Sequence, residues 1–373
     1  MRLSSIFPPL IFAFSLQVAA QTPLPPQPDV LVLSDDERLI GHFIRSNGSS
    51  VVFKSDLLGE VTVDWAKVKE LRSATRYAVV EKNVKLENRA DAAKVPKGSV
   101  EVSNQTITLH PATGPAQNIP VAESAHIMDA GTFEEHIERR PGFSESWNGK
   151  VAFDAALIQA TQQSRAFGGS VSLVRAVPIE TWLPPRNRTL IDFSAARGSV
   201  SQPNTPTVKT EIWHAGAERD QYFSRYRLYG FGQALFDHNF SQGLDLMQNY
   251  GGGLGWTAIQ KPSLTLDLKA SINYIKQQFQ VASNNHNLVA STFSENLTRR
   301  FGHGMVFAQQ LSVTPTWNEM SAWLASGGAS LTAPVYKRLA FHVEVLDNYL
   351  HSPPVGFKKN SFQASTGLTY SLR

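Results

Sequence analysis

The segment from Ser263 to Ile275 is the part of this sequence that most restricts the fold. Its side chains alternate between polar and apolar from Ser263 to Tyr274. Side chains on a β-strand point to opposite faces in turn, so this pattern predicts a strand with one apolar and one polar face. The apolar face would carry Leu264, Leu266, Leu268, Ala270, Ile272 and Tyr274, and the polar face Thr265, Asp267, Lys269, Ser271 and Asn273.

The same alternation recurs along the chain after Trp147 and ends with a final segment that carries Tyr370 and Leu372 on its apolar face. We expect twelve strands, over residues 149–160, 165–177, 189–201, 208–217, 222–236, 244–259, 264–280, 288–301, 305–317, 322–335, 340–350 and 361–373. Strands of roughly ten residues or more can cross a bilayer when tilted, and bacterial single-chain barrels have an even number of them. The sequence therefore predicts an all-β fold whose main part, residues 148–373, is a transmembrane antiparallel β-barrel of about 12 strands.

An even strand count places both ends of the barrel on one side of the membrane. On this count the connections on that side are short, at residues 260–263, 302–304 and 336–339, and those on the other side are longer, at 237–243, 281–287 and 351–359. Outer-membrane barrels have short periplasmic turns and longer outer loops, so the domain that precedes the barrel is expected in the periplasm. Residues 178–187 form a long connection on the periplasmic side, which would fit a count that is off by one hairpin.

The N-terminus reads as a secretory signal peptide over residues 1–20. Arg2 supplies the positive charge, residues 8–16 the apolar core, and Val18, Ala19 and Ala20 the small residues before a cleavage site. An N-terminal membrane anchor is the alternative, but the apolar run is too short and too rich in proline for it. The proline-rich residues 21–28 are expected to have no fixed structure.

Two small β units are expected before the barrel. The first, residues 29–75, has five short strands and a turn at Asn47-Gly48, which suggests a small SH3-like or Sm-like domain. The second, residues 76–130, ends in a segment (residues 119–127) that resembles residues 63–71 of the first, so a duplication is possible. Residues 131–147 would be a linker, with a short helix or an extended stretch at residues 132–140.

Composition excludes several classes of function. The chain has no cysteine, so it has no disulfide, thiolate metal site or cysteine nucleophile. Its net charge is only +4 and its basic residues are scattered, which gives no reason to expect nucleic acid as a partner.

No motif in the sequence identifies a catalytic, cofactor or metal site. Glycines 251–253 and Gly255 lack the spacing and the βαβ context of a nucleotide-binding loop, so we interpret them as strand positions where a neighbouring side chain needs room. The histidine that most suggests a metal site is His238 beside Asp237, and two residues are too few for one. We therefore expect no cofactor, no metal and no catalytic residue.

A hydrolase embedded in the barrel remains an alternative. It would need a serine, a histidine and an orienting polar residue from neighbouring strands, for which His214, Ser224, His342 and Ser365 are the candidates. No serine lies in a Gly-x-Ser-x-Gly motif.

Charged residues within the expected strands should face the lumen, because a charge that faces lipid near the midplane costs about 2–4 kcal/mol. The lumen-facing candidates are Asp267, Lys269 and Glu344, and the lipid-facing candidates are Leu264, Leu266, Leu268, Tyr370 and Leu372. Whether the lumenal charges pair and seal the barrel or line a narrow channel stays open.

The region from residue 146 to the end resembles a family of salt-induced outer-membrane proteins of unknown function. The resemblance is carried by residues 236–246 with 251–256, by 293–297, and by 352–360 with 366–371; residues 58–65 also resemble domains that precede such barrels. It implies an outer-membrane location, and it implies no established activity and no catalytic residues. One departure is at the end: outer-membrane barrels commonly finish with an aromatic residue on the lipid-facing line, whereas that line ends here at Leu372, with Arg373 after it.

These observations favour a non-enzymatic outer-membrane barrel, structural or a narrow pore, with a periplasmic β domain. Its expected partners are outer-membrane lipid, the barrel-assembly machinery and possible periplasmic proteins. Two alternatives stay open besides the hydrolase: a periplasmic binding module that the barrel merely anchors, and a soluble two-sheet protein, because alternating strands also form sandwiches.

Overall fold

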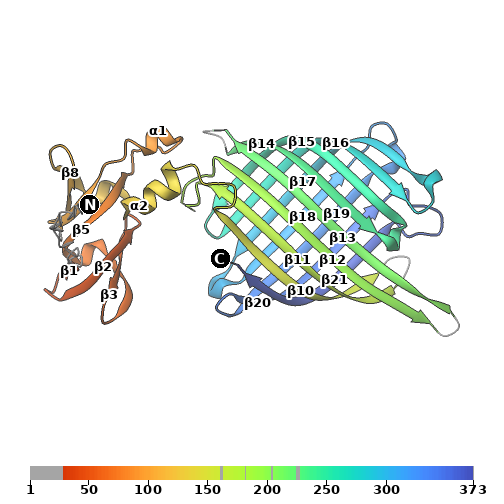
Figure 1. Cartoon of the computed structure of the whole chain (residues 1–373), viewed down its shortest axis with the longest axis horizontal. Coiled ribbons are helices and arrows are strands. Elements are labelled where there is room, and N and C mark those ends of the chain that lie inside the picture. The colour runs from red at the N-terminus through yellow and green to blue at the C-terminus, as the bar shows by residue number, and fades with distance from the viewer. Residues whose placement is uncertain (1–27, 160–162, 181, 203–204, 224–226, 373) are drawn as a thin grey trace, which may run out of the picture. The chain divides into compact units, whose positions relative to one another are not determined.

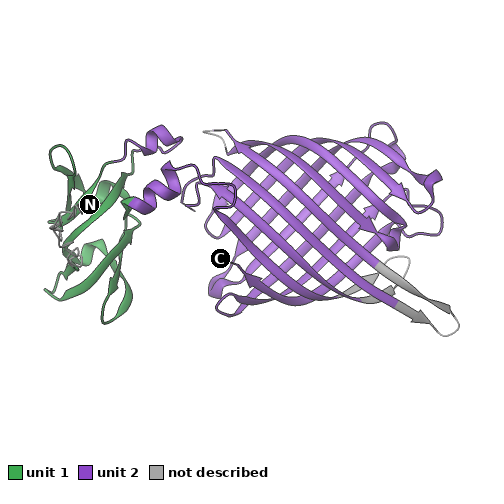
Figure 2. Ribbon diagram, viewed as in Figure 1, with its two compact units in different colours: residues 1–83, 96–130 green, residues 84–95, 131–373 purple. Residues whose placement is uncertain are grey.

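The computed structural model describes residues 28–159, 163–180, 182–202, 205–223 and 227–372. The expected signal peptide and nearly all of the expected leader lie outside these residues. The chain divides into two compact units: residues 1–83 with 96–130, and residues 84–95 with 131–373 (Figure 2).

The first unit is a single antiparallel sheet of nine strands. In the sheet the order is β4-β3-β2-β1-β5-β6-β7-β8, and β9 pairs with β2 and β5. The strands are β1 Asp29–Leu33, β2 Arg38–Ser46, β3 Ser50–Ser55, β4 Gly59–Asp64, β5 Val68–Glu81, β6 Lys97–Ser103, β7 Thr106–Pro111, β8 Gln117–Pro120 and β9 Ser124–Asp129.

One apolar core joins the two small units that we expected from the sequence. Leu31, Phe43 and Trp65 from the first half pack in the same buried cluster as Ile107 and Ile127 from the second. The long strand β5 runs through the expected boundary at residues 75 and 76, and it pairs with β1 on one side and β6 on the other. The two expected units therefore form one domain, because neither half could bury its apolar face without the other.

The local structure of the two halves is nevertheless similar. In each half a short strand leads into a one-turn 3₁₀ helix and then into the next strand: β4, η1 Trp65–Lys67 and β5 in the first, and β8, η2 Val121–Glu123 and β9 in the second. This parallel agrees with the duplication that the sequence suggested.

Three short helical elements belong to the second unit, the one that contains the barrel. They are α1 Arg89–Ala92, α2 Ala130–Phe133 and the π-helical turn η3 Glu134–Glu138. A capping box fixes the start of α1: the Asn88 side chain accepts from the Asp91 amide at 3.0 Å, and the Asp91 side chain accepts from the Asn88 amide at 3.3 Å. No helix in the described parts of the chain is long and apolar enough to span a membrane.

The rest of the second unit is a closed barrel of twelve antiparallel strands (Figure 1). The ring closes where β10 pairs with β21, from Lys150 opposite Ser371 to Gln159 opposite Phe362. The strands are β10 Trp147–Gln159, β11 Gln163–Val177, β12 Asn187–Gln202, β13 Thr205–Tyr222, β14 Leu228–Asn239, β15 Leu244–Lys261, β16 Leu264–Phe279, β17 His286–Arg300, β18 Val306–Thr314, β19 Leu324–Tyr336, β20 Leu339–Leu350 and β21 Asn360–Ser371.

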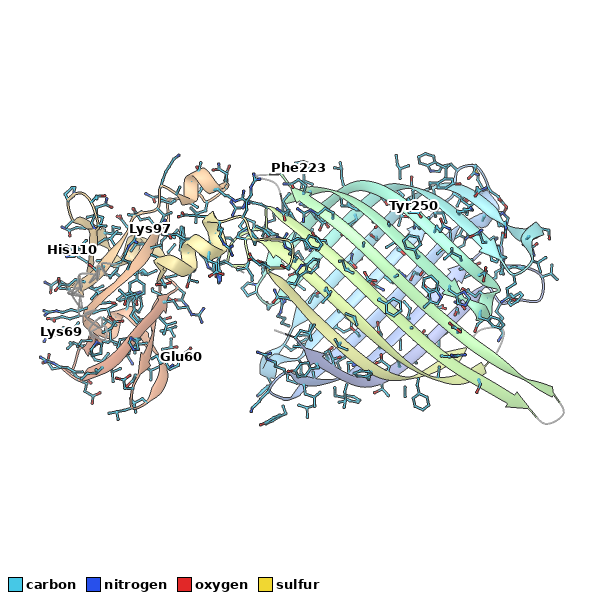
Figure 3. The ribbon with its side chains drawn as sticks, viewed as in Figure 1. Glu60, Lys69, Lys97, His110, Phe223 and Tyr250 are labelled. Carbon is cyan, nitrogen blue, oxygen red and sulfur yellow. The ribbon has the colours of Figure 1, made fainter. Side chains whose placement is uncertain are left out.

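The outer surface of the barrel is apolar. Phe153, Phe167 and Ile272 are 72%, 79% and 58% exposed, and Tyr250, labelled in Figure 3, is 43% exposed. Other large apolar side chains on this surface are Phe193, Leu254, Phe293, Leu311, Leu331, Phe341, Val343 and Leu368. The fold class that the sequence predicted is thus confirmed, with twelve strands and a small β domain before them.

One connection lies where the strand count placed it, and two strand boundaries differ from expectation. The long connection at residues 178–186 does lie at the barrel end where β10 starts and β21 finishes, which we call the terminal end, so the strand count is not off by a hairpin. Tyr222 ends β13 instead of starting the next strand, because it pairs with Tyr229 of β14, which begins at Leu228. The expected loop at residues 237–243 is shorter, since β14 continues to Asn239.

Three glycines of β15 make room inside the barrel. A Cβ atom on Gly251 would lie 1.6 Å from Asn273 Oδ1, and one on Gly255 would lie 2.1 Å from Tyr229 Cζ. Gly253 faces the backbone of β16 at a similar distance. These glycines therefore occupy positions where a neighbouring side chain or strand lies close, as the sequence suggested.

We predict that Gly255→Ala lowers the free energy of unfolding of the barrel by about 1–3 kcal/mol, because Tyr229 is fully buried and its ring would have to move. Unfolding by urea in detergent micelles measures this. Gly232→Ala on the adjacent strand β14 is the control, since nothing lies within 4 Å of its added Cβ. Equal stabilities for the two variants would contradict this role of Gly255.

Candidate functional site in the barrel lumen

The inner face of the barrel is lined by polar side chains, many of them in ion pairs. On β16, Asp267, Ser271 and Asn273 are at most 7% exposed, whereas Ile272 and Tyr274 between and beside them face outward. The alternation along β16 thus puts Asp267 and Lys269 in the lumen, and we take the lumen as the candidate functional site.

A cluster of five charged residues spans the lumen near the terminal end. This lumenal charge cluster consists of Arg188, Glu218, Asp220, Asp267 and Lys269. Arg188 Nε donates to Asp220 Oδ2 at 2.7 Å on the neighbouring strand, and Arg188 Nη1 lies 3.5 Å from Asp267 Oδ2 on β16, four strands away round the ring. Lys269 of β16 pairs with Glu218 of β13. Because the Arg188–Asp267 and Lys269–Glu218 pairs join strands that are not neighbours, they narrow the lumen at this level.

Two tyrosines pack against the cluster. The Arg188 guanidinium lies 5.5 Å from the ring centre of Tyr229 and 5.9 Å from that of Tyr222. Thr257 of β15 donates to Asp267 Oδ1 at 2.6 Å. The cation therefore lies between two carboxylates and two aromatic faces, an arrangement that stabilises a buried charge without water.

A histidine bridges two carboxylates further along the lumen. His214 Nε2 lies 2.8 Å from Asp192 Oδ2, and its Nδ1 lies 2.6 Å from Asp237 Oδ1. Asp237 therefore faces inward, whereas its neighbour His238 faces outward, where it stacks on Trp213 at 5.9 Å. The Asp-His pair that could have suggested a metal site is split between the two faces of β14. Among the described residues, no group of three or more metal-binding side chains comes together.

The second candidate histidine has a hydroxyl and a carboxylate as partners. His342 Nε2 lies 2.5 Å from Asp154 Oδ1, and Thr369 Oγ1 lies 2.9 Å from His342 Nδ1. Threonine, histidine and aspartate are the residue types of a nucleophile, base and orienting acid. However, Thr369 is 8% exposed and His342 5%, so the hydroxyl is shielded inside the barrel. Ser365 is also buried on β21, and Ser224 lies outside the described residues.

The far end of the lumen is crossed by a segment of the chain. Residues 239–243, which we call the crossing segment, connect β14 to β15 and contain the 3₁₀ turn η4 Phe240–Gln242. The Gln242 side chain donates to the backbone oxygens of Asn348 and Lys359 at 3.1 and 2.8 Å. Asn239 Nδ2 donates to Ser361 Oγ at 3.0 Å. Since β20 and β21 lie half-way round the ring from β14 and β15, the segment reaches the opposite wall.

An apolar cluster lies inside the barrel at the same end. It consists of Leu244, Ile275, Phe279, Leu288, Ala290, Ala322, Leu324 and Leu350, all at most 9% exposed. Gly243 closes the crossing segment in the left-handed region, with φ of 70°, and a Cβ there would lie 2.9 Å from the ring of Phe357. The far mouth is thus filled by the crossing segment and by packed apolar side chains.

The residues singled out from the sequence have clear positions. Asp267 and Lys269 belong to the lumenal charge cluster. Glu344 shares the inner-face register of His342, and no ion pair of its carboxylate exists among the described residues. Leu268, Tyr370 and Leu372 are 37%, 48% and 45% exposed, and Leu264 and Leu266 are half-buried.

Sequence reasoning missed Arg188 and the crossing segment. Arg188 lies at the first positions of its strand, just before the predicted start at residue 189. The crossing segment was taken for part of a solvated outer loop, and the only signal in the sequence is that Asn239, Ser241 and Gln242 are short or amide-bearing residues suited to hydrogen bonding.

We predict that Arg188→Gln destabilises the barrel by about 3–5 kcal/mol, because it leaves Asp220 and Asp267 buried without a cation. The double variant Arg188→Gln with Asp220→Asn should recover part of this loss. Thermal unfolding in detergent compares the two. Arg197→Gln, at an exposed position of the same strand, is the control, and an Arg188 variant as stable as this control would contradict the role of the cluster.

Comparison with solved structures finds several outer-membrane barrels at low similarity. The NanC porin is 9% identical, with a TM-score of 0.40, and the match covers 60% of this chain and 100% of the porin. An outer-membrane channel from Pseudomonas putida F1 is 10% identical, with a TM-score of 0.38, and covers 63% of this chain and 100% of its own. The KdgM porin is 10% identical, with a TM-score of 0.34, and covers 60% and 99%.

No curated protein matches the chain. A family model does match: that of DUF481, a protein family of unknown function, aligns with residues 181–372, more than half of the 373 residues. The matched region runs from the connection before β12 through the last strand of the barrel. The chain therefore belongs to the DUF481 family of proteins of unknown function.

Proposed function

We propose that this chain is an outer-membrane β-barrel that forms a narrow polar pore, closed at its far mouth by the crossing segment. One observation carries the proposal: Gln242 reaches across the lumen and donates to two backbone oxygens of the opposite wall. A lumen lined by hydrogen-bonding and charged groups offers a path for water and small polar solutes wherever this segment moves aside.

The membrane location is supported by the two faces of the barrel. The outer surface carries exposed Phe153, Phe167 and Ile272, whereas the lumenal charge cluster lies inside. In a closed ring the backbone N–H and C=O groups of every strand pair with a neighbouring strand on each side. This pairing is the condition for spanning a bilayer with strands. A soluble two-sheet protein would instead bury its apolar faces against each other, so the exposed apolar surface favours the membrane.

Orientation follows from the even number of strands. Both barrel termini lie at the terminal end, and bacterial outer-membrane barrels place that end in the periplasm. The domain of residues 29–130 would then be periplasmic. The proposal includes outer-membrane lipid and the barrel-assembly machinery as partners, and a periplasmic protein as a ligand of that domain. The resemblance to a family of salt-induced proteins stays a prediction.

The function that we propose for the barrel does not include an enzymatic activity. Thr369, His342 and Asp154 share the residue types and the hydrogen bonds of a triad, but the Thr369 hydroxyl is buried. A hydrolase needs its nucleophile exposed to substrate. Their burial supports a role in joining β10, β20 and β21 across the closure of the ring.

We predict that Asn239→Ala with Gln242→Ala raises the mean single-channel conductance, or the fraction of time open, relative to the wild type. The change removes the side chains that tie the crossing segment to Ser361, Asn348 and Lys359. Planar-bilayer recordings at fixed salt measure it. Gln280→Ala, at an exposed position of the same barrel end, is the control and should behave as the wild type.

The proposal of a pore would be contradicted if the wild type and the double variant are both folded and neither conducts ions. Deletion of residues 29–128 separates the pore from a binding module, since a pore keeps its conductance without the N-terminal domain. If the deletion abolishes a periplasmic interaction and no variant conducts, the barrel is only the anchor of that domain.

A further inference from the structure

A pocket lined by arginines lies on the outer wall of the barrel at its terminal end. Its volume is about 540 Å³, within the range of small-ligand sites, and residues 88–90 at the start of α1 and residues 140–141 line it together with barrel residues. The rim arginine pocket is defined by Arg89, Arg140, Arg175, Arg186 and Arg219. None of the described residues that line it is acidic.

The strand register shows that the pocket opens on the outer face. On β11, Arg175 is eight residues from Phe167, so both side chains point to the same side, and Phe167 is 79% exposed on the apolar surface. On β12 and β13, Asn187 and Gln221 pair with each other on that same side. The pocket is therefore outside the lumen.

Its height along the barrel matches the edge of a membrane. Eight strand residues span roughly 26 Å, and a tilt near 40° reduces this to roughly 20 Å along the barrel axis. The apolar band of such barrels is about 25 Å tall, and Arg175 is only two residues from the end of β11 at Val177, so it lies near the edge of this band, beside the lipid headgroups. At the terminal end these headgroups belong to the periplasmic leaflet.

Neutral groups hold the arginines in place and leave their charge unbalanced. Arg175 donates to the backbone oxygens of Glu145, Pro141 and Gly142 at 2.9, 3.0 and 2.9 Å. Arg186 donates to the Ile137 oxygen at 2.6 Å. Carbonyl acceptors orient a guanidinium, but they do not neutralise it.

Two guanidinium groups have a buried N–H that meets no acceptor. These are the Nε atoms of Arg89 and Arg186. Burial, and then the nearby charge of Arg140, lowers the pKa of Arg89; burial, and then the charge of Arg89, lowers the pKa of Arg186. The positive charges of Arg89, Arg140 and Arg186 thus repel one another around a cavity. An anion between them would offset this repulsion and would accept hydrogen bonds from the two N–H groups that lack an acceptor.

We propose that the rim arginine pocket binds the phosphate of a phospholipid headgroup in the periplasmic leaflet. Guanidinium groups match phosphate oxygens with paired hydrogen bonds, and a phosphate at this level is supplied by the membrane itself. The proposal rests on the membrane location given above. It also explains the long connection of residues 178–186, which supplies Arg186 and holds η3 through the pair of Glu180 and His136 at 2.6 Å.

The test uses the full-length protein and a short-chain phosphatidylglycerol in detergent. Native mass spectrometry gives the dissociation constant for wild type and for Arg89→Gln with Arg186→Gln. We expect the double variant to bind about tenfold more weakly or worse, since each basic residue near a membrane surface contributes about 1 kcal/mol of lipid attraction, a factor of about five. Arg299→Gln, an exposed arginine near the terminal end of β17 and outside the pocket, should bind as the wild type.

Unfolding curves for all variants establish that each is folded. Equal affinities for the wild type and the double variant would overturn the site. Inorganic phosphate that binds as tightly as the lipid, with the same loss in the double variant, would overturn the lipid assignment in favour of a soluble anion. Failure of the pore proposal can be told apart from failure of the lipid site, because a barrel that conducts no ions still binds the lipid if this inference is correct.

Discussion

Backbone hydrogen bonding between β10 and β21 is the interaction on which the rest of the barrel depends. It joins the first and last strands over ten residue pairs, from Lys150 opposite Ser371 to Gln159 opposite Phe362, and it leaves the sheet without an edge. Once the ring is closed, every strand has one face outside and one inside. Apolar residues such as Phe153 and Leu368 then cover the outside, and Asp154 and His342 meet inside across the closure.

Closure also determines how the lumen is filled. Charges inside the ring need partners, because the side chains around them are packed. Arg188 finds two carboxylates, one of them four strands away, and Tyr229 lies over Gly255 where any larger residue would collide. At the far mouth the crossing segment also bridges the ring, through hydrogen bonds of the uncharged side chains of Asn239 and Gln242. The narrow polar lumen that we propose as a pore is thus a consequence of pairing across the ring.

Alternation along single strands made the fold predictable, whereas contacts across the ring were not. The pattern of residues 264–274 is local, and it sufficed to assign Asp267 to one face and Leu268 to the other. The contact of Asn239 with Ser361 depends instead on the register of every strand pair between β14 and β21. A local sequence pattern contains no information about that register. Asp237 and His238 were expected in a loop, whereas β14 continues to Asn239 and puts them on opposite faces. In the N-terminal domain, β5 was divided between two units because its length shows only once both halves pack on it.

The central claim is that this chain is a closed barrel in a membrane, and gel mobility tests it most directly. Outer membranes would be isolated, and the protein compared after detergent treatment with and without boiling. A closed barrel resists detergent until it is heated, so the account predicts a faster-moving or slower-moving unheated form that converts to a single unfolded form on boiling. Identical mobility in both samples, with the protein in the soluble periplasmic fraction, would contradict the account.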